Sequence, residues 1–220
     1  MKPLIIFGVG QIAEVANYLF SEDSDYDVSA FAVDDNYRDR DTHLGLPVVA
    51  FEQLEESHPP DEYDLFVAMG YSKVNVIRCA KVTEARAKGY NLASYVSSRA
   101  WVWHGFEARG NTMVMEHNTI QPYVTVGENC ILWSGNHIGH HTQIGDNVFV
   151  ASHAVIAGSV SIGDGCFIGI NATIKDNITI GPHCVVGAGA MVLQDAPGKT
   201  VFPGTPTEPS RVPSDRLRSI

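Results

Sequence analysis

Two adjacent histidines are the residues of this chain whose chemistry is most suggestive. His140 and His141 lie in the segment 139–142, and Gly158 follows His140 eighteen residues later. An imidazole titrates near neutral pH, so histidine suits general-base work. A glycine beside such a base lets a backbone N–H approach a ligand and donate to an oxyanion. The pair and the glycine therefore predict proton abstraction next to a carbonyl centre.

These residues belong to a repeat with a period of six. Every sixth position from 114 to 192 is aliphatic, over fourteen positions in succession. The fourteen residues are Val114, Ile120, Val126, Leu132, Ile138, Ile144, Val150, Ile156, Ile162, Ile168, Ile174, Ile180, Val186 and Val192. A fixed short period indicates a solenoid, and a period of six is typical of a parallel β-helix. The repeat therefore predicts short strands separated by tight corners.

The repeat also predicts which side chains meet. Three hexads close one triangular coil, so residues eighteen apart lie one above the other, separated by about 4.8 Å. The aliphatic residue fills the prism, and a glycine after it permits the corner. In this frame His140 and His141 fall at a corner, and Gly158 stacks above His140. Corners face solvent and collect polar residues, so His117 and His183 are predicted to be ordinary surface histidines.

The N-terminal part follows a different pattern, in which strands alternate with helices. Strands are predicted at residues 4–7, 28–33, 45–49, 65–68 and 92–96, and helices at 11–20, 51–57 and 73–88. Such alternation predicts a small, Rossmann-like parallel α/β sheet. We expect three regions, which are a Rossmann-like domain at 1–98, a β-helix at 99–196 and a proline-rich capping tail at 197–220.

A glycine-rich turn joins the first predicted strand to the first predicted helix. It reads Gly8-x-Gly10-x-x-Ala13, and Asp34 and Asp35 end the next strand. Backbone N–H groups at a helix start bind anions, and a carboxylate after the next strand can accept a ribose hydroxyl. The domain is about half the size of a full dinucleotide domain, which favours a nucleotide-diphosphate ligand over NAD. A turn that serves packing alone is the alternative.

Composition excludes several classes of protein. The 220 residues carry a formal net charge of −10, which argues against nucleic acid as a partner. No apolar run is long enough for a transmembrane helix, and the N-terminus does not read as a signal peptide. The four cysteines form no CxxC motif; Cys130, Cys166 and Cys184 share one inward column and are expected to pack as small hydrophobic residues. A reducing, cytoplasmic setting is therefore expected.

The hexads resemble those of the left-handed β-helix acyltransferases. The two-part arrangement, the glycine-rich turn, the Asp34-Asp35 pair and the 139–142 corner resemble bacterial nucleotide-sugar N-acetyltransferases of the bacillosamine and perosamine type, whose relatives include sialic acid O-acetyltransferases. The resemblance covers nearly the whole chain. It implies an α/β domain followed by a left-handed parallel β-helix, a homotrimer with sites between subunits, and acetyl-CoA as co-substrate with no metal.

The resemblance also implies roles for single residues. His140 matches the family's general base, Gly158 matches the glycine that faces the thioester carbonyl, and His141 stands where the family usually has an acidic residue. The matched coenzyme A contacts are Ile170 and Ala188, with a further family contact falling at Phe149. The matched nucleotide-sugar positions are Gly10, Gln11, Ile12, Asp34, Asp35 and Gly70, although many relatives have histidine where Ile12 stands. The candidate cations for the coenzyme A phosphates are Lys175, Lys199 and Arg211, each of which is alternatively ordinary surface.

These matches imply direct acetyl transfer to the amino group of a nucleotide-linked amino-deoxy sugar, for a surface polysaccharide such as O-antigen. His140 takes a proton from the amine, and the Gly158 N–H stabilises the oxyanion, with no acyl-enzyme. Three alternatives stay open. They are O-acetylation of a sialic-acid-like sugar, a zinc enzyme similar to the γ-type carbonic anhydrases, and a non-catalytic scaffold. The zinc ligands would come from His137, His140, His141 and His153.

Overall fold

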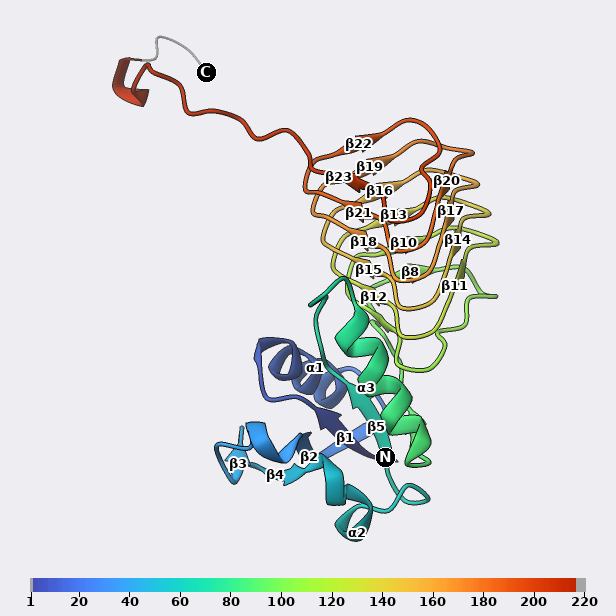
Figure 1. Cartoon of the computed structure of the whole chain (residues 1–220). Helices are drawn as coiled ribbons and strands as arrows, with labels where there is room; N and C mark the ends of the chain where they lie inside the picture. Colours follow the sequence, from blue (N-terminus) through green and yellow to red (C-terminus); the bar gives the residue numbers. More distant parts are fainter. Residues whose placement is uncertain (1, 217–220) are drawn as a thin grey trace.

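The computed structural model describes residues 2–216 as an α/β domain, a triangular solenoid and an extended C-terminal segment (Figure 1). The predicted N-terminal domain and tail extend to Met1 and to residues 217–220, which lie outside the described residues. Among residues 2–216, none of the helices combines the length and hydrophobicity needed to span a membrane.

The N-terminal domain is built on one six-stranded sheet with the order β3-β4-β2-β1-β5-β6. Its strands are β1 (Lys2–Phe7), β2 (Tyr26–Val33), β3 (Thr42–His43), β4 (Leu46–Ala50), β5 (Asp64–Val67) and β6 (Asn91–Leu92). Every pair is parallel except β3 with β4, which is antiparallel. The predicted parallel sheet is confirmed, with an antiparallel edge strand added. Parallel strands end at one common edge, which brings the segments after β1, β2 and β5 together.

Helices cover both faces of this sheet. They are α1 (Gln11–Glu22), α2 (Leu54–Ser57) and α3 (Val76–Ala87), with short 3-10 helices η1 (Asp35–Tyr37), η2 (Phe51–Gln53) and, in the tail, η3 (Ser214–Arg216). On one face, Ala13, Ala16 and Phe20 of α1 pack against β1 and β2. On the other face, Val82 and Ala85 of α3 pack with residues of η2 and α2.

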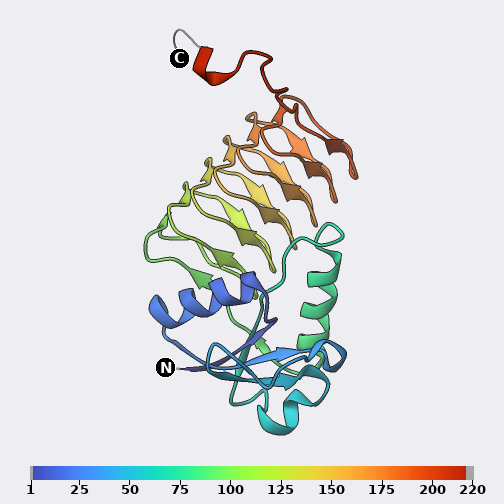
Figure 2. The same ribbon diagram turned by 90° about the vertical axis from the view of Figure 1, so that its left-hand side faces the viewer.

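The solenoid has three flat faces, each a stack of two-residue parallel strands (Figure 2). Face 1 contains β7 (Tyr95–Val96), β9 (Met113–Val114), β12 (Ile131–Leu132), β15 (Phe149–Val150), β18 (Phe167–Ile168), β21 (Val185–Val186) and β23 (Val201–Phe202). Face 2 contains β8 (Trp101–Val102), β10 (Thr119–Ile120), β13 (His137–Ile138), β16 (Val155–Ile156), β19 (Thr173–Ile174) and β22 (Met191–Val192). Face 3 contains β11 (Thr125–Val126), β14 (Gln143–Ile144), β17 (Ser161–Ile162) and β20 (Thr179–Ile180).

The solenoid confirms the eighteen-residue stacking. His137 pairs with Val155, which pairs with Thr173, and all fourteen hexad aliphatics lie in the cluster that fills the prism. Cys130, Cys166 and Cys184 are buried and free, as expected for small core residues. We name the two corners that flank face 2. Corner 1–2 connects face 1 to face 2, and corner 2–3 connects face 2 to face 3.

Two predicted elements near the junction differ from the structure. The predicted strand 92–96 is divided, because β6 joins the N-terminal sheet whereas β7 pairs with β9 in the solenoid. The predicted helix 73–88 begins three residues later, at Val76, since Lys73, Val74 and Asn75 have left-handed φ angles of 51°, 53° and 67°. Both differences arise where the α/β domain meets the solenoid, so long-range contacts override local propensity there.

Candidate active site

His140 lies at corner 2–3, directly after β13. Its backbone N–H donates to Gln121 Oε1 at 2.9 Å, and its Nδ1 lies 3.1 Å from His141 Nδ1. One of these two nitrogens must carry the hydrogen of the bond. A base acting through His140 Nε2 requires the hydrogen on its own Nδ1, and His141 is then the acceptor that selects this tautomer.

His141 is held by an aromatic stack from the coil below. Its φ is 61°, and its ring lies 4.7 Å from the Tyr123 ring, which in turn lies 5.5 Å from Trp103. Tyr123 precedes His141 by eighteen residues. The eighteen-residue spacing is the signal in the sequence that corresponds to this contact. The stack holds the His141 ring beside His140, at the position where the family resemblance predicts an acidic residue.

Gly158 meets the ring of His140 from the coil above. A Cβ atom built at Gly158 would lie 2.7 Å from His140 Cε1 and 2.8 Å from Nε2, which is closer than real Cβ contacts allow. A side chain at position 158 would therefore require this imidazole to shift. Among residues 2–216, no acceptor takes the Gly158 N–H, whereas its carbonyl accepts from Asn177 at 3.1 Å. A free N–H beside a basic nitrogen can stabilise an oxyanion that forms there.

The predicted coenzyme A contacts occupy another part of the solenoid. Ile170 and Ala188 are exposed and stack eighteen residues apart at corner 1–2. His140 lies at corner 2–3, so the width of face 2 separates it from this column. Lys175, by contrast, is exposed at corner 2–3, eighteen residues after Ala157 and therefore one coil above the neighbour of Gly158. One copy of the chain therefore does not bring the predicted base and the predicted coenzyme contacts together.

Phe149 requires a correction. Its ring is 4% exposed and lies between Trp133 and Phe167, at centroid distances of 6.2 and 5.8 Å, with Tyr71 at 5.0 Å. It belongs to the core that joins face 1 to the N-terminal domain. A side chain buried in this way offers no surface to coenzyme A, so Phe149 is removed from the candidate site.

The glycine-rich turn forms an open cradle at the carboxyl edge of the sheet. Gly8 has a φ of 120° and approaches Ala68, whereas a Cβ built at Gly10 would meet nothing within 4 Å. Gln11 begins α1, whose first N–H groups point to this open space. Gly70 lies against Ile12, because a Cβ there would come within 3.1 Å of Ile12 Cδ1. The structure thus brings together the four positions 10, 11, 12 and 70.

Asp34 and Asp35 follow β2 at the same edge, and Asp34 already has a partner. Its carboxylate accepts a hydrogen bond from Lys81 Nζ at 2.6 Å, and Lys81 lies over the rings of Phe7 and Phe51. Burial alone would lower the pKa of Lys81, but Asp34 and Glu84 raise it, so the ammonium stays charged. Asp35 is exposed, which leaves its carboxylate accessible to a ligand.

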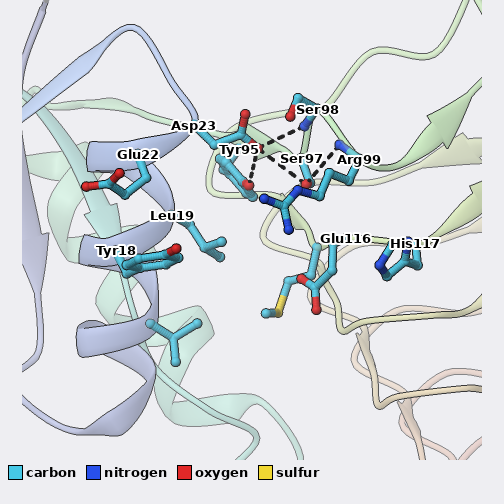
Figure 3. A pocket seen from close by; sticks show the side chains of 12 residues that line it. Tyr18, Leu19, Glu22, Asp23, Tyr95, Ser97, Ser98, Arg99, Glu116 and His117 are labelled. Atoms are coloured by element: carbon cyan, nitrogen blue, oxygen red, sulfur yellow. Dashed lines mark hydrogen bonds between the residues drawn. The ribbon is translucent and has the colours of Figure 1, made fainter.

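A separate cavity of about 660 Å³ lies between α1 and the first coils (Figure 3). Asp23 forms one wall, where it accepts from Tyr95 Oη at 2.8 Å and from the Ser98 N–H at 2.9 Å. The bonds from Ser98 lower the pKa of Asp23 despite partial burial. The cavity contains no predicted site residue. Within residues 2–216, no group of three or more His, Cys, Asp or Glu side chains is arranged to hold a metal.

Comparison with known proteins identifies the repeat and the fold. The family model for bacterial transferase hexapeptide (six repeats) matches residues 123–158 and 159–194. A search of curated protein sequences gave no significant match. Several solved structures, however, match nearly the whole chain.

A mutant of perosamine N-acetyltransferase from Caulobacter crescentus, in complex with CoA and GDP-perosamine, is 25% identical, with a TM-score of 0.83 over 94% of this chain and 96% of that chain. PerB from the same organism, with the same two ligands, is 26% identical, with a TM-score of 0.80 over 91% and 93%. The acetyltransferase domain of PglB from Neisseria gonorrhoeae shares the fold, with 22% identity and a TM-score of 0.62 over 96% and 100%. These matches confirm the predicted left-handed β-helix. The chain is therefore an acyltransferase built on hexapeptide repeats, and it resembles the nucleotide-sugar N-acetyltransferases along nearly its whole length.

Proposed function

We propose that the chain transfers the acetyl group of acetyl-CoA to the amino group of a nucleotide-linked amino-deoxy sugar. The amine nitrogen attacks the thioester carbonyl, a C–N bond forms and the C–S bond breaks. His140 Nε2 takes the proton from nitrogen, and the same proton then neutralises the departing thiolate. The Gly158 N–H stabilises the tetrahedral oxyanion. No acyl-enzyme forms.

The contact between Gly158 and His140 carries this proposal. An exposed imidazole packed against a glycine whose backbone N–H has no acceptor among residues 2–216 provides the two groups that aminolysis of a thioester needs. The open cradle at Gly10 supports a nucleotide diphosphate as the handle of the acceptor. The neighbours that bind CoA and GDP-perosamine support the same pair of substrates.

We assign the nucleotide to residues 1–98, the transfer chemistry to 99–196 and a capping role to 197–220. Gly10, Gln11, Ile12, Asp35 and Gly70 surround the nucleotide site in this scheme. Ile170 and Ala188 contact coenzyme A, and Lys175 lies near one of its phosphates. Asp34 contributes to the nucleotide site when it exchanges its hydrogen bond with Lys81 for one with the ligand. An acetamido sugar of this kind serves surface glycan synthesis, including O-antigen.

A homotrimer would complete the site. Face 2 carries the exposed apolar side chains Trp101, Val155 and Met191, whereas the outward residues of face 3 are all polar. Three copies that turn face 2 toward a common axis place corner 2–3 of one copy beside corner 1–2 of the next. That arrangement supports a site in which His140 of one copy meets the coenzyme column of its neighbour.

We expect Val155→Asp to separate the trimer and to abolish turnover. Val155 is 44% exposed in the middle of face 2, and burying three carboxylates at one interface is strongly unfavourable. Sedimentation velocity and the rate of thiol release measure the two effects. Ser161→Asp on face 3 is the matched control and should stay trimeric and active. A monomeric Val155→Asp variant with full turnover would contradict a site shared between copies.

The proposed reaction is tested by incubating the protein with acetyl-CoA and GDP-perosamine. Thiol release should require both substrates, and mass spectrometry should show one acetyl group on the sugar. An acetyl group that survives hydroxylamine is an amide, whereas one that hydroxylamine removes is an ester. An ester product would replace the amine by a hydroxyl as the acceptor. If none of a panel of nucleotide-linked amino sugars were acetylated, the result would contradict the proposed function.

A further inference from the structure

Arg78, on α3, is the largest fully buried side chain of the described residues, and its exposed fraction is 0%. Its guanidinium donates Nε to Asn129 Oδ1 at 3.1 Å, Nη1 to the Gly70 carbonyl and to Asn75 Oδ1 at 2.9 Å each, and Nη2 to the carbonyls of Asn129 and Asn147 at 3.1 and 3.2 Å. All of these acceptors are neutral. Asn129 and Asn147 belong to the solenoid, whereas Gly70 belongs to the N-terminal domain.

A buried arginine without a carboxylate partner is unusual. Among residues 2–216, none of the ion pairs includes Arg78, although burial lowers its pKa only to about 10, so it stays charged at neutral pH. Desolvating a cation is unfavourable, and the planar guanidinium of Arg78 offsets part of this cost because it donates hydrogen bonds to several carbonyls at once. An arginine beside a proposed nucleotide site is commonly a phosphate ligand. The complete burial of Arg78 excludes direct contact with a ligand.

The loop before α3 is fixed to the same place. Lys73, Val74 and Asn75 form a left-handed turn, a conformation that non-glycine residues adopt in succession only when the surroundings impose it. Asn75 Nδ2 donates to the carbonyls of Gly165 and Cys166 at 3.2 and 3.0 Å, and its Oδ1 accepts from Arg78. Tyr71 packs on the rings of Phe149 and Phe167, at 5.0 and 4.7 Å. Three side chains thus attach loop 70–75 to face 1 and the adjoining corner.

This attachment continues into the nucleotide cradle. Gly70 accepts from Arg78 on one side and lies against Ile12, in the first turn of α1, on the other. We infer that Arg78 is a positioning residue, which holds the Gly70 edge of the nucleotide site at a fixed place relative to the solenoid. The inference rests on the proposed function. It assigns to Arg78 the alignment of the acceptor amine with the reactive corner, without contact to either substrate.

The test compares two acceptors in the same sample, which are GDP-perosamine and perosamine 1-phosphate. The shorter acceptor has the amino sugar but lacks the nucleoside monophosphate, so it cannot use the cradle fully. In the unmodified protein, kcat/KM should be much higher for the nucleotide-linked acceptor. Arg78→Met keeps the volume of the side chain and removes its donors. We expect the ratio of the two kcat/KM values to fall at least about tenfold, because misplacement of one bound group reduces only the reaction that relies on it.

The ratio distinguishes positioning from general loss of structure. A fraction of unfolded protein lowers the measured kcat/KM for both acceptors by the same factor, so it does not change their ratio. Arg78→Lys retains the charge but not the planar fork, so its ratio should lie between those of the unmodified protein and Arg78→Met. Asn75→Ala removes the neighbouring attachment and should lower the ratio in the same direction. Arg86→Gln, on the same helix but exposed and paired with Glu128, is the matched control and should leave the ratio unchanged.

An unchanged ratio in Arg78→Met, with both acceptors slowed alike, would overturn the inference. Equal kcat/KM values for the two acceptors in the unmodified protein would also overturn it, since the cradle would then contribute nothing to alignment. The absence of acetyl transfer to either acceptor in the unmodified protein would instead remove the proposed function. The two failures are therefore distinguishable.

Discussion

Replacing His140 with alanine is expected to lower kcat for acetyl transfer by about 10²- to 10⁴-fold, the range that a positioned general base contributes. The reason is geometric, since His140 Nε2 lies against Gly158, where the tetrahedral intermediate would form. Thiol release under saturating acetyl-CoA and GDP-perosamine measures the effect. The KM for acetyl-CoA should change little, because coenzyme binding is assigned to Ile170 and Ala188 of the neighbouring copy rather than to His140.

His183→Ala is the matched control for this substitution. His183 is an exposed corner histidine, like His140, and it lies at the corner between faces 3 and 1, away from Gly158. Its variant should retain full turnover. His141→Phe keeps an aromatic ring against Tyr123 but removes the nitrogen that accepts from His140, so an intermediate loss is expected. Full turnover of His140→Ala would show that another group receives the amine proton.

Substituting Gly158 with alanine is expected to reduce kcat by about 10²- to 10³-fold, as for the loss of one oxyanion donor. The added Cβ would lie 2.7 Å from His140 Cε1, so the imidazole must move away from residue 158. The corner is otherwise open to solvent, so the melting temperature should change little. Steady-state kinetics and a thermal melt on the same preparation measure both quantities.

Ser159→Ala provides the control at the next position of the same corner. Ser159 is exposed and has a φ of 58°, so removing its hydroxyl changes neither the contact with His140 nor the core. This variant should keep its turnover. If Gly158→Ala also kept its turnover, the close approach of residue 158 to the imidazole would have no part in the reaction, and the oxyanion would have to be stabilised elsewhere.

The hexads explain why so much of the solenoid was predictable. Ile138, Ile156 and Ile174 repeat at eighteen residues, and that spacing fixes both the inward column and the neighbour of each corner residue. The proximity of Gly158 to His140 follows from the same rule. Local repetition suffices here because each coil contacts only the coils above and below it.

Features that depend on packing between domains were not predictable in this way. The family resemblance predicts a coenzyme A contact at Phe149, yet this residue is buried beside Tyr71, and that contact depends on how the two domains pack. Val74 has helical neighbours in sequence but adopts a left-handed φ, because Asn75 is held by carbonyls ninety residues away. The bonds of Arg78 depend on the same long-range contacts, and no local pattern encodes them.

Because the coils are stacked and equal in height, the distance along the solenoid between the reactive corner and the coenzyme column can change only in fixed steps during evolution. An insertion of eighteen residues between positions 159 and 169 would raise Ile170 and Ala188 by one strand spacing, about 4.8 Å, and leave every inward column in register. An insertion of six or twelve residues would keep the aliphatic residues inward but would transfer Ile170 and Ala188 to a different corner. An insertion into the continuous repeat that is not a multiple of six would turn the aliphatic residues out of the prism. The reach between the reactive corner and the coenzyme can therefore lengthen only in whole coils. Selection for a longer or shorter acyl donor could therefore change this distance only by one coil at a time, not gradually.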